Sequence, residues 1–303
     1  MNTKLTEFLN SNFNKEQVLF DEPMSRHTTF KVGGPAKYFI RPSDAEALAS
    51  LIAFLKKEKI SYYVTGNGSN LLVSDKGYDG VIISTSAMDE VTVDGNRIVA
   101  AAGAMNSRIA SAALEHSLSG MEALSGIPGS IGGGVTMNAG AYGSEMKDIV
   151  ELVEAITPEG KRVCLSNEQM DFSYRSSAVR KLGLIVVSVI LCLSMGDREL
   201  IKEDMGDYAA RRRDKQPLEY PSAGSTFKRP AGNYAGKLIE EAGLKGFSVG
   251  SAAVSDKHAG FVINKGGASA DDVYQVIRQV QDRVEEKSGI RLETEVVLLG
   301  EFE

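Results

Sequence analysis

A glycine-dense tract is the feature that most restricts what this chain can fold into. Eight of the 31 glycines in the 303-residue sequence lie between Gly120 and Gly143. Glycine weakens the interior of helices and strands, and it is favoured where the backbone turns tightly or approaches another group closely. We therefore predict that this tract is mostly ordered loop. Glycine-rich turns after strands also leave main-chain N–H groups available for phosphate.

Composition and charge narrow the class of protein. Hydrophobic residues make up 43% of the chain and charged residues 24%, as in a globular protein long enough for two domains. The net charge of −6 disfavours nucleic acid or an anionic membrane as a partner of the whole protein. The longest apolar run, Leu184 to Leu193, is too short to span a bilayer, and the N-terminus has no apolar signal core. We expect a cytoplasmic protein.

The cysteines and histidines do not form a recognisable metal or redox motif. Cys164 and Cys192 lie in apolar, strand-like runs, which predicts two buried free thiols rather than a disulfide. His27, His116 and His258 are scattered, and neither H-E-x-x-H nor C-x-x-C occurs. We therefore predict no metal site.

Hydrophobic periodicity predicts an α+β fold. A capping box from Ser43 to Glu46 begins one helix, and a second box at Ser269 and Asp272 begins a long one. Their apolar faces are predicted at Leu48, Leu51, Ile52 and Leu55, and at Val273, Ile277, Val280 and Val284. The dipeptide Asp94-Gly95 predicts a hairpin turn. Further helices are predicted at 106–118, 198–213 and 235–242, and strands at 61–64, 81–84, 91–93, 98–100, 149–156, 162–165, 184–194, 251–254, 260–264 and 292–299.

The chain changes character near Met195, where an apolar strand gives way to Gly196-Asp197 and a highly charged helix. This change predicts one domain at 1–195, with subdomains at about 1–65 and 66–195, and a second domain at 196–303. The last strand of the second domain is an element that could return to the first subdomain.

Two familiar nucleotide-binding motifs are absent. Gly66-x-Gly68-x-x-Leu71 lacks the third glycine of the Rossmann fingerprint, and no acidic residue follows at the ribose position. The run from Gly232 to Leu238 is one residue short for a P-loop and has Leu where the magnesium-binding hydroxyl belongs. A G-x-S-x-G nucleophile elbow is also missing, so a hydrolase triad has no support.

Motifs in a fixed order nevertheless identify a family. They are Thr28-Thr-Phe-Lys-Val-Gly-Gly34, Gly66-Asn-Gly-Ser-Asn-Leu71, Ser125-Gly-Ile-Pro-Gly-Ser-Ile-Gly-Gly133, Met137-Asn-Ala-Gly-Ala-Tyr-Gly143, Tyr174-Arg-Ser-Ser177, Pro221-Ser-Ala-Gly-Ser-Thr-Phe-Lys228 and Leu292-Glu-Thr-Glu-Val296. Together they closely resemble the UDP-N-acetylenolpyruvoylglucosamine reductase (UDP-N-acetylmuramate dehydrogenase) family of bacterial flavoenzymes. Little room remains between Arg175 and Leu184 for the tyrosine-bearing loop of longer members, so the chain resembles the shorter form, type II.

The resemblance implies a fold and an activity. The fold is a PCMH-type (vanillyl-alcohol-oxidase-type) FAD-binding domain of two α+β subdomains, followed by a smaller α+β substrate-binding domain that closes over the flavin. The activity is NADPH-dependent reduction of the enolpyruvyl group of a UDP-sugar in peptidoglycan precursor synthesis, with hydride from FAD N5. A nucleotide-sugar substrate, the cofactor FAD, NADPH as donor and a monomer are therefore expected.

Three residues carry the implied chemistry. In the resemblance Ser225 donates the proton, and Arg175 and Glu295 meet the substrate carboxylate and its developing enolate. A guanidinium suits a carboxylate because it offers a planar fork of donors. Glu295 would need a raised pKa or a bridging water to hydrogen-bond an anion. Strand alternation puts Glu293 on the same face, so only the family pattern selects Glu295.

The resemblance also assigns binding residues. The expected FAD contacts are Gly66, Asn67, Gly68, Ser69, Asn70, Ile127, Pro128, Gly129, Gly132 and Gly133 at the pyrophosphate, and Asn138, Ala139 and Gly140 beside the isoalloxazine. The expected contacts to the nucleotide-sugar are Tyr174, Lys215 and Lys228.

Two other functions stay open at this point. Another PCMH-type FAD oxidase would share the glycine loops but not Ser225, Arg175 and Glu295 together. A non-catalytic protein that binds a flavin or a nucleotide-sugar could keep the same fold. For Ser225 alone, a plain turn serine beside Gly224 would be the default interpretation, and the surrounding motif reverses it.

Overall fold

The computed structural model describes residues 2–303 as a mixture of helices and sheets. They form two compact units, which we describe separately. The first unit holds the residues up to Phe20, Tyr38–Asn67 and Gly80–Ala210, and the second holds Asp21–Lys37, Gly68–Asp79 and Arg211–Glu303. Segments far apart in the sequence therefore belong to one unit.

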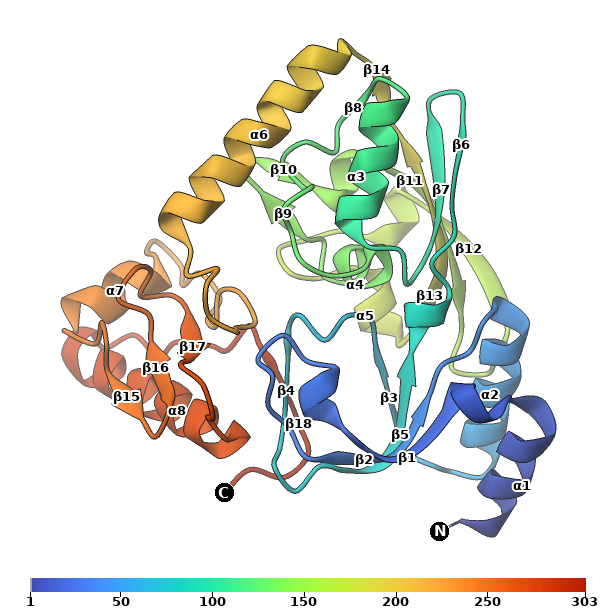
Figure 1. Cartoon of the computed structure of the whole chain (residues 1–303), viewed down its shortest axis with the longest axis horizontal. Coiled ribbons are helices and arrows are strands. Elements are labelled where there is room, and N and C mark those ends of the chain that lie inside the picture. Colours follow the sequence, from blue (N-terminus) through green and yellow to red (C-terminus); the bar gives the residue numbers. More distant parts are fainter. Residues whose placement is uncertain (1) are drawn as a thin grey trace. The chain divides into compact units, whose positions relative to one another are not determined.

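A five-stranded antiparallel sheet is the centre of the first unit (Figure 1). Its order is β12-β11-β13-β7-β6, with β6 at Val91–Asp94, β7 at Arg97–Ala101, β11 at Val150–Ile156, β12 at Arg162–Ser166 and β13 at Ile185–Cys192. Asp94 pairs with Arg97 across the β6–β7 turn, and Gly95 takes the left-handed φ of +58° that such a turn needs. The predicted hairpin is confirmed.

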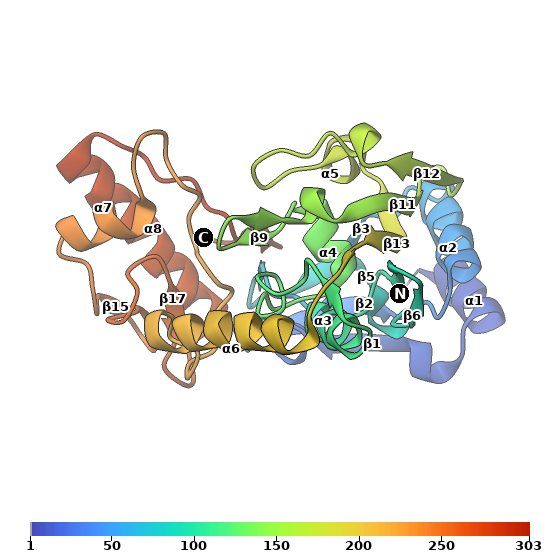
Figure 2. The same ribbon diagram turned by 90° about the horizontal axis from the view of Figure 1, so that it is seen from above.

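Helices α1 (Thr3–Asn12) and α2 (Ala45–Lys57) lie side by side (Figures 1 and 2). The rings of Phe8 and Phe54 stack between them with centroids 4.1 Å apart. The predicted apolar face of α2 is buried. Its N-cap, however, is Asp44 rather than Ser43: the Asp44 carboxylate accepts a hydrogen bond from Ala47 N at 2.8 Å. An ionised carboxylate is the stronger acceptor for a free helix N–H.

A second sheet has the order β1-β2-β5-β3. Its strands are β1 (Val18–Pro23), β2 (Pro35–Ile40), β5 (Tyr78–Ser84) and β3 (Tyr62–Thr65). Strands β3 and β5 are parallel, with Thr65 opposite Ser84. Gly66 therefore follows the edge strand of this sheet.

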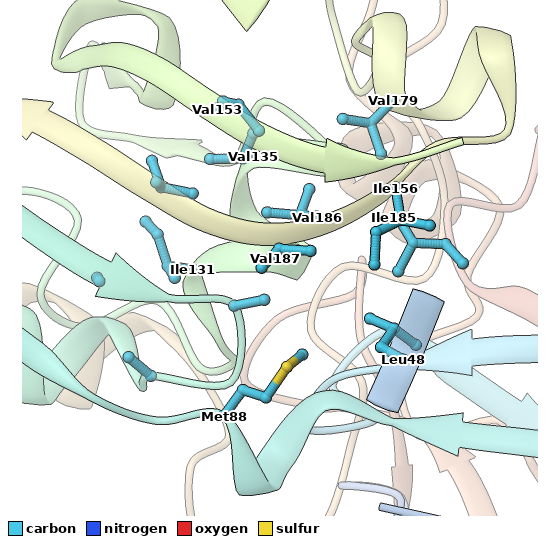
Figure 3. Close-up of a cluster of buried hydrophobic side chains, with 14 of the residues drawn as sticks. Leu48, Met88, Ile131, Val135, Val153, Ile156, Val179, Ile185, Val186 and Val187 are labelled. Atoms are coloured by element: carbon cyan, nitrogen blue, oxygen red, sulfur yellow. The ribbon is translucent and has the colours of Figure 1, made fainter. Parts of the chain in front are cut away.

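The glycine tract is mostly loop, as predicted, but it also contains one short helix. Helix α4 (Ile131–Thr136) holds three consecutive glycines. In Figure 3 its apolar residues Ile131 and Val135 point toward side chains of the five-stranded sheet, including Val187 and Val153. Burial of Ile131 and Val135 compensates for the low helix propensity of the three glycines. Helix α3 (Asn106–Glu115) ends three residues before the predicted end at Leu118.

The remaining elements of the first unit are short. They are β8 (Leu118–Ser119) paired with β14 (Ser194–Met195), β9 (Gly140–Ala141) paired with β10 (Ser144–Glu145), helix α5 (Ala178–Leu182), and the 3-10 helices at Thr85–Ala87, Met146–Asp148, Glu168–Met170 and Lys15–Gln17. The charged helix α6 (Arg198–Lys215) buries only Ile201.

The second unit packs two helices with a small antiparallel sheet. Helices α7 (Ala235–Glu241) and α8 (Ala270–Ser288) accompany the sheet β15-β16-β17, formed by Ser248–Val249, Ala252–Val254 and Val262–Asn264. The capping box of Ser269 and Asp272 is confirmed, as is the buried apolar face of α8. Asp75 adds a second cap, because its two carboxylate oxygens accept from Ala270 N and Asp271 N, both at 2.9 Å.

Strand β18 is shorter than predicted. Only Val297–Leu299 is regular, and it pairs in parallel with β4 (Leu71–Val73). Residues 292–296 instead meet the segment around Phe227 through one isolated bridge, Phe227 to Thr294. The 3-10 helix Met24–Arg26 also lies in this unit. The strand pattern of 292–299 cannot reveal that residues 292–296 and residues 297–299 pair with different segments.

Cys164 and Cys192 are free thiols as predicted, but both are exposed rather than buried. Cys164 lies on β12, an edge strand, and Cys192 is the last residue of β13, so neither is covered by a second layer.

None of the helices in residues 2–303 combines the length and apolar character of a membrane span. The same residues contain no group of three or more His, Cys, Asp or Glu that could hold a metal.

Candidate functional site

Gly66 and Ser130 meet where β3 ends and α4 begins. A Cβ on Gly66 would lie only 2.2 Å from Ser130 Oγ, so a larger residue there would force the Ser130 hydroxyl to move. Ser130 is 3% exposed, and its hydroxyl has no hydrogen-bond partner within residues 2–303. A buried hydroxyl without a partner is costly in a folded protein. It therefore marks a place where a polar ligand group would fit.

Free main-chain donors lie around this hydroxyl. At the start of α4, Ile131 N and Gly132 N already bind Ala104 O and Ala102 O, at 2.8 and 2.9 Å. In the described part of the chain, the N–H groups of Gly66, Asn67 and Gly133 donate to no main-chain carbonyl. Gly133 is exposed, and the nearest atom to a Cβ there would be Ser130 Oγ, 3.8 Å away.

We call Gly66, Asn67, Ser130 and Gly133 the cradle. Free N–H groups and a hydroxyl beside a helix N-terminus are the donor set that a phosphate needs. The cradle therefore fits the pyrophosphate of the dinucleotide implied by the resemblance. Sequence reasoning missed Ser130, although it follows Pro128-Gly129, because only the glycines and the Ile-Pro pair of that motif were considered. Of the other predicted residues there, Ile127 is half-buried, Pro128 is exposed and Gly129 is buried with a φ of +121°.

Gly68 belongs to the second unit and is also fixed by a close approach. Its φ is +60°, and a Cβ would lie 2.0 Å from the main-chain oxygen of His27. Thr29 N donates to Gly68 O at 3.3 Å. The segment around Thr29 is therefore the support for the loop from Gly68 to Asn70. Ser69 and Asn70 in that loop are half-buried.

Asn138, just after α4, uses its side chain inside the protein. The amide nitrogen donates to Glu145 Oε2 at 3.0 Å and to Ser173 O at 3.3 Å, and the amide oxygen accepts from Lys147 N at 3.0 Å. The residue is 1% exposed with a φ of +43°. The neighbouring Ala139 and Gly140 are half-exposed. Of these three predicted flavin neighbours, Asn138 holds the loops in place.

Arg175 lies in a tight turn attached to this loop. Ser173 and Ser176 exchange main-chain hydrogen bonds of 3.0 and 3.1 Å, so Tyr174 and Arg175 form the tip of the turn. Ser177 Oγ donates to Thr136 O at 3.0 Å and ties the turn to the end of α4. The guanidinium lies 5.1 Å from the ring centroid of Tyr174, which is 51% exposed.

The charge environment of this turn includes Glu145. A hydrogen bond from Lys147 is the main cause that lowers the Glu145 pKa, and the positive charge of Arg175 lowers that pKa further. Arg175 itself has a φ of +55°, a conformation that favours glycine. Strained residues of this kind concentrate at functional sites.

In the second unit, the structure brings Ser225 next to Glu295. Glu295 N donates to Thr226 O at 2.8 Å, and Lys228 N donates to Glu293 O at 2.9 Å. The two segments therefore run antiparallel, with Glu295 paired to Thr226 and Ser225 one position before Thr226. Ser225 is exposed and follows Gly224, whose φ is +74°.

The two glutamates that alternation leaves equivalent differ in the structure. Glu293 is exposed and forms an ion pair of 3.0 Å with Lys228, whereas Glu295 is half-buried. Lys228, a predicted substrate contact, is thus paired with a carboxylate. Lys215, which is also a predicted substrate contact, is exposed at the end of α6.

His258 supports the backbone beside Ser225. Its Nδ1 accepts a hydrogen bond from Gly260 N at 3.1 Å, and Gly260 O accepts from Thr226 N at 2.9 Å. Burial lowers the pKa of His258, which favours the neutral ring that this acceptor role requires.

Comparisons with known proteins follow this geometry. Residues 36–166 match an FAD binding domain, and residues 216–299 match the C-terminal domain of UDP-N-acetylenolpyruvoylglucosamine reductase. The chain is 51% identical over 299 residues to UDP-N-acetylenolpyruvoylglucosamine reductase of Caldanaerobacter subterraneus subsp. tengcongensis, covering 98% of this chain and 97% of that protein. It is 49% identical over 284 residues to the enzyme of that name from Clostridium botulinum strain Hall, covering 94% and 93%.

Solved structures agree with the sequence comparisons. The reductase from Thermus caldophilus is 36% identical, with a TM-score of 0.79 over 93% of this chain and 98% of that one. Phl p 4, a glucose dehydrogenase, is 15% identical and matches 64% of this chain and 44% of its own with a TM-score of 0.51, which indicates a shared fold alone. The expected α+β fold with a PCMH-type FAD-binding domain is confirmed.

Proposed function

Because this chain belongs to the UDP-N-acetylenolpyruvoylglucosamine reductase family and is an FAD-containing oxidoreductase of peptidoglycan precursor synthesis, we propose a reaction and assign its residues. The chain reduces the enolpyruvyl group of UDP-N-acetylglucosamine enolpyruvate to give UDP-N-acetylmuramate, and NADPH supplies the electrons. The enzyme acts in the cytoplasm as a monomer, with 1–195 as its FAD-binding domain and 196–303 as its substrate-binding domain.

One observation carries this assignment. Thr226–Lys228 pairs with Glu293–Glu295 in the second unit, so exposed Ser225, which precedes Thr226, and half-buried Glu295 lie on adjacent segments. A proton donor and a group that manages developing charge are the two parts that protonation of a carbanion needs. A binding protein without activity would have no use for this pair.

Each residue has a chemical role. Bound FAD, once reduced by NADPH, would supply the hydride for the terminal carbon of the enol ether. Negative charge then spreads onto the substrate carboxylate, where the Arg175 guanidinium offers two parallel donors. Ser225 Oγ gives its proton to the adjacent carbon, which completes the addition of one hydride and one proton to the double bond. A positioned acid of this kind contributes on the order of 10²–10⁴-fold.

The binding roles follow the geometry of each unit. The cradle residues, Gly68 and the segment from Ile127 to Gly129 hold the FAD pyrophosphate, while Ala139 and Gly140 border the isoalloxazine. Tyr174, Lys215 and Lys228 contact the nucleotide-sugar. Lys228 exchanges Glu293 for a phosphate when the substrate binds, because an exposed ion pair is worth only about 0–1 kcal/mol.

An anaerobic two-step experiment tests this function. Holoenzyme is reduced with NADPH, and UDP-N-acetylglucosamine enolpyruvate is then added while flavin absorbance is followed. We expect bleaching in the first step and full return of absorbance in the second. Flavin that reoxidises only when oxygen is admitted would instead indicate an oxidase and overturn the proposal.

Variants assign the proton donor in the same experiment. Ser225→Ala should be reduced by NADPH at the wild-type rate and reoxidise at least 100-fold more slowly, in the range given for general acids. Ser222→Ala, a serine of the same motif to which we assign no role, is the matched control and should reoxidise normally. Equal losses in both steps for Ser225→Ala would point to a structural serine.

A further inference from the structure

We propose that Asn70 is a positioning residue whose side chain fixes the main chain of Glu295 and so couples the cofactor loop to the acidic residue of the site. This inference rests on the proposed function. Asn70 Nδ2 donates a hydrogen bond to Glu295 O at 3.0 Å, although 225 positions separate the two residues in the sequence. Both lie in the second unit.

A second hydrogen bond reinforces the contact. Val297 N donates to Asn70 O at 3.0 Å, so Asn70 binds the chain on both sides of Val296. Val296 is 2% exposed. The regular parallel pairing of β4 with β18 begins only at Leu71 and Val297. The side chain of Asn70 therefore extends that pairing backward to Glu295, where no strand ladder reaches.

The other side of Glu295 is fixed by the Ser225 segment. Glu295 N donates to Thr226 O, so the N–H and the C=O of Glu295 are both bound, one toward Ser225 and one toward Asn70. A half-buried carbonyl without a partner would be unfavourable and free to shift. The carboxyl of Glu295 thus keeps its place relative to Ser225 only while Asn70 holds its peptide.

This role explains why residue 70 is an amide. The contact requires a donor on a short side chain, which aspartate and leucine cannot supply. Asn70 directly follows Gly68-Ser69, the loop that rests against His27 and Thr29. Any ordering of that loop when FAD binds therefore reaches the peptide of Glu295 directly through the side chain of Asn70.

Half-reaction kinetics test the proposal in the holoenzyme. The Asn70 side chain, which the resemblance assigns to FAD, binds Glu295 O in the structure. For Asn70→Ala and the isosteric Asn70→Asp we therefore expect the flavin spectrum and the rate of reduction by NADPH to stay within about twofold of wild type. Reoxidation by UDP-N-acetylglucosamine enolpyruvate should slow by about 10- to 100-fold, the effect of a small misplacement of a reacting group. A double variant with Glu295→Gln should be no slower than Glu295→Gln alone, because Asn70 acts through Glu295.

The chain offers a matched control. Gln281 Nε2 donates to Leu292 O at 2.8 Å, the same kind of amide-to-carbonyl bond on the same segment, three residues before Glu295. Gln281→Ala should lower the free energy of unfolding as Asn70→Ala does, yet leave reoxidation within about twofold of wild type. Equal slowing in both variants would mean that any loosening of the segment matters, and the specific role of Asn70 would be lost.

Hydrogen exchange separates this proposal from the function on which it rests. In Asn70→Ala, amides at 295–297 should exchange faster than in wild type, whatever substrate the enzyme uses. Unchanged exchange there, additive losses with Glu295→Gln, or a weakened FAD complex would each overturn the role of Asn70. Failure of wild-type flavin to reoxidise, together with faster exchange in the variant, would instead reject the substrate and leave the structural coupling in place.

Discussion

At the scale of single residues, Arg175 has a backbone conformation that its own side chain disfavours. Its φ of +55° belongs to the left-handed region, where glycine is the usual residue. Holding a larger residue there costs about 1 kcal/mol or more. The surrounding bonds, from Ser173 to Ser176 and from Ser177 to Thr136, maintain the turn. Because the fold maintains this strained conformation at a cost, we expect the guanidinium of Arg175 to have a function.

The comparison of Arg175→Gly with Arg175→Ala tests this strain. Both variants remove the guanidinium, so both should lose reoxidation of the flavin by the substrate. Arg175→Gly should nevertheless be more stable than Arg175→Ala by about 1 kcal/mol, because glycine adopts the left-handed conformation without strain. Urea unfolding of the two proteins measures the difference. Equal stabilities would show that the turn relaxes and that φ at this position is not constrained.

At the scale of elements, α4 shows how packing decides the use of glycine. A Cβ on Gly132 would lie 2.9 Å from the main-chain oxygen of Ala102, whereas Gly133 faces open space beside Ser130. Neighbouring glycines therefore serve different purposes. Gly132 lets the helix approach β7, and Gly133 leaves the cradle open.

Alanine at Gly133 and at Gly132 should change the free energy of unfolding of the apoprotein in opposite directions. Gly133→Ala should raise the free energy of unfolding by about 0.5–1 kcal/mol through helix propensity, yet weaken FAD binding because its methyl group enters the cradle. Gly132→Ala should destabilise the protein by about 1–3 kcal/mol through overpacking against a main-chain atom. Urea unfolding without FAD and a flavin fluorescence titration measure the two quantities. A gain in stability from both substitutions would contradict this account of α4.

At the scale of the whole molecule, the compact units interleave along the chain. The loop that carries the first predicted FAD contacts passes from the first unit at Asn67 to the second at Gly68. The predicted boundary near residue 195 remains a proposal about domains. The compact units themselves are not contiguous in the sequence, because 21–37 and 68–79 belong to the second unit.

Cofactor binding should stabilise this molecule as a whole. FAD that binds only the folded state, at about 100 times its Kd, raises the free energy of unfolding by about 2.7 kcal/mol. We therefore expect the stripped apoprotein to melt at a lower temperature, and added FAD to restore the holoprotein value. Thermal unfolding with and without FAD measures this, with FMN as a control that lacks the adenylate phosphate. An unchanged melting temperature would contradict FAD binding to the folded chain.

Elements whose signals are local could be predicted from the amino-acid sequence. The apolar faces of α2 and α8, the cap of α8 and the turn at Gly95 follow from residues within a few positions of one another. The ordered motifs were enough to identify the family, because short segments with special backbone requirements keep their residues.

Features that depend on residues distant in the sequence became visible in the folded chain. It showed that α4 forms despite its glycines, that Ser130 has a buried hydroxyl beside Gly66, and that Cys164 lies on an uncovered edge strand. It also separated Glu293, paired with Lys228, from Glu295, bound to Thr226 and Asn70. Alternation along a strand has the same period for both glutamates, so their difference arises from contacts with residues far away in the sequence.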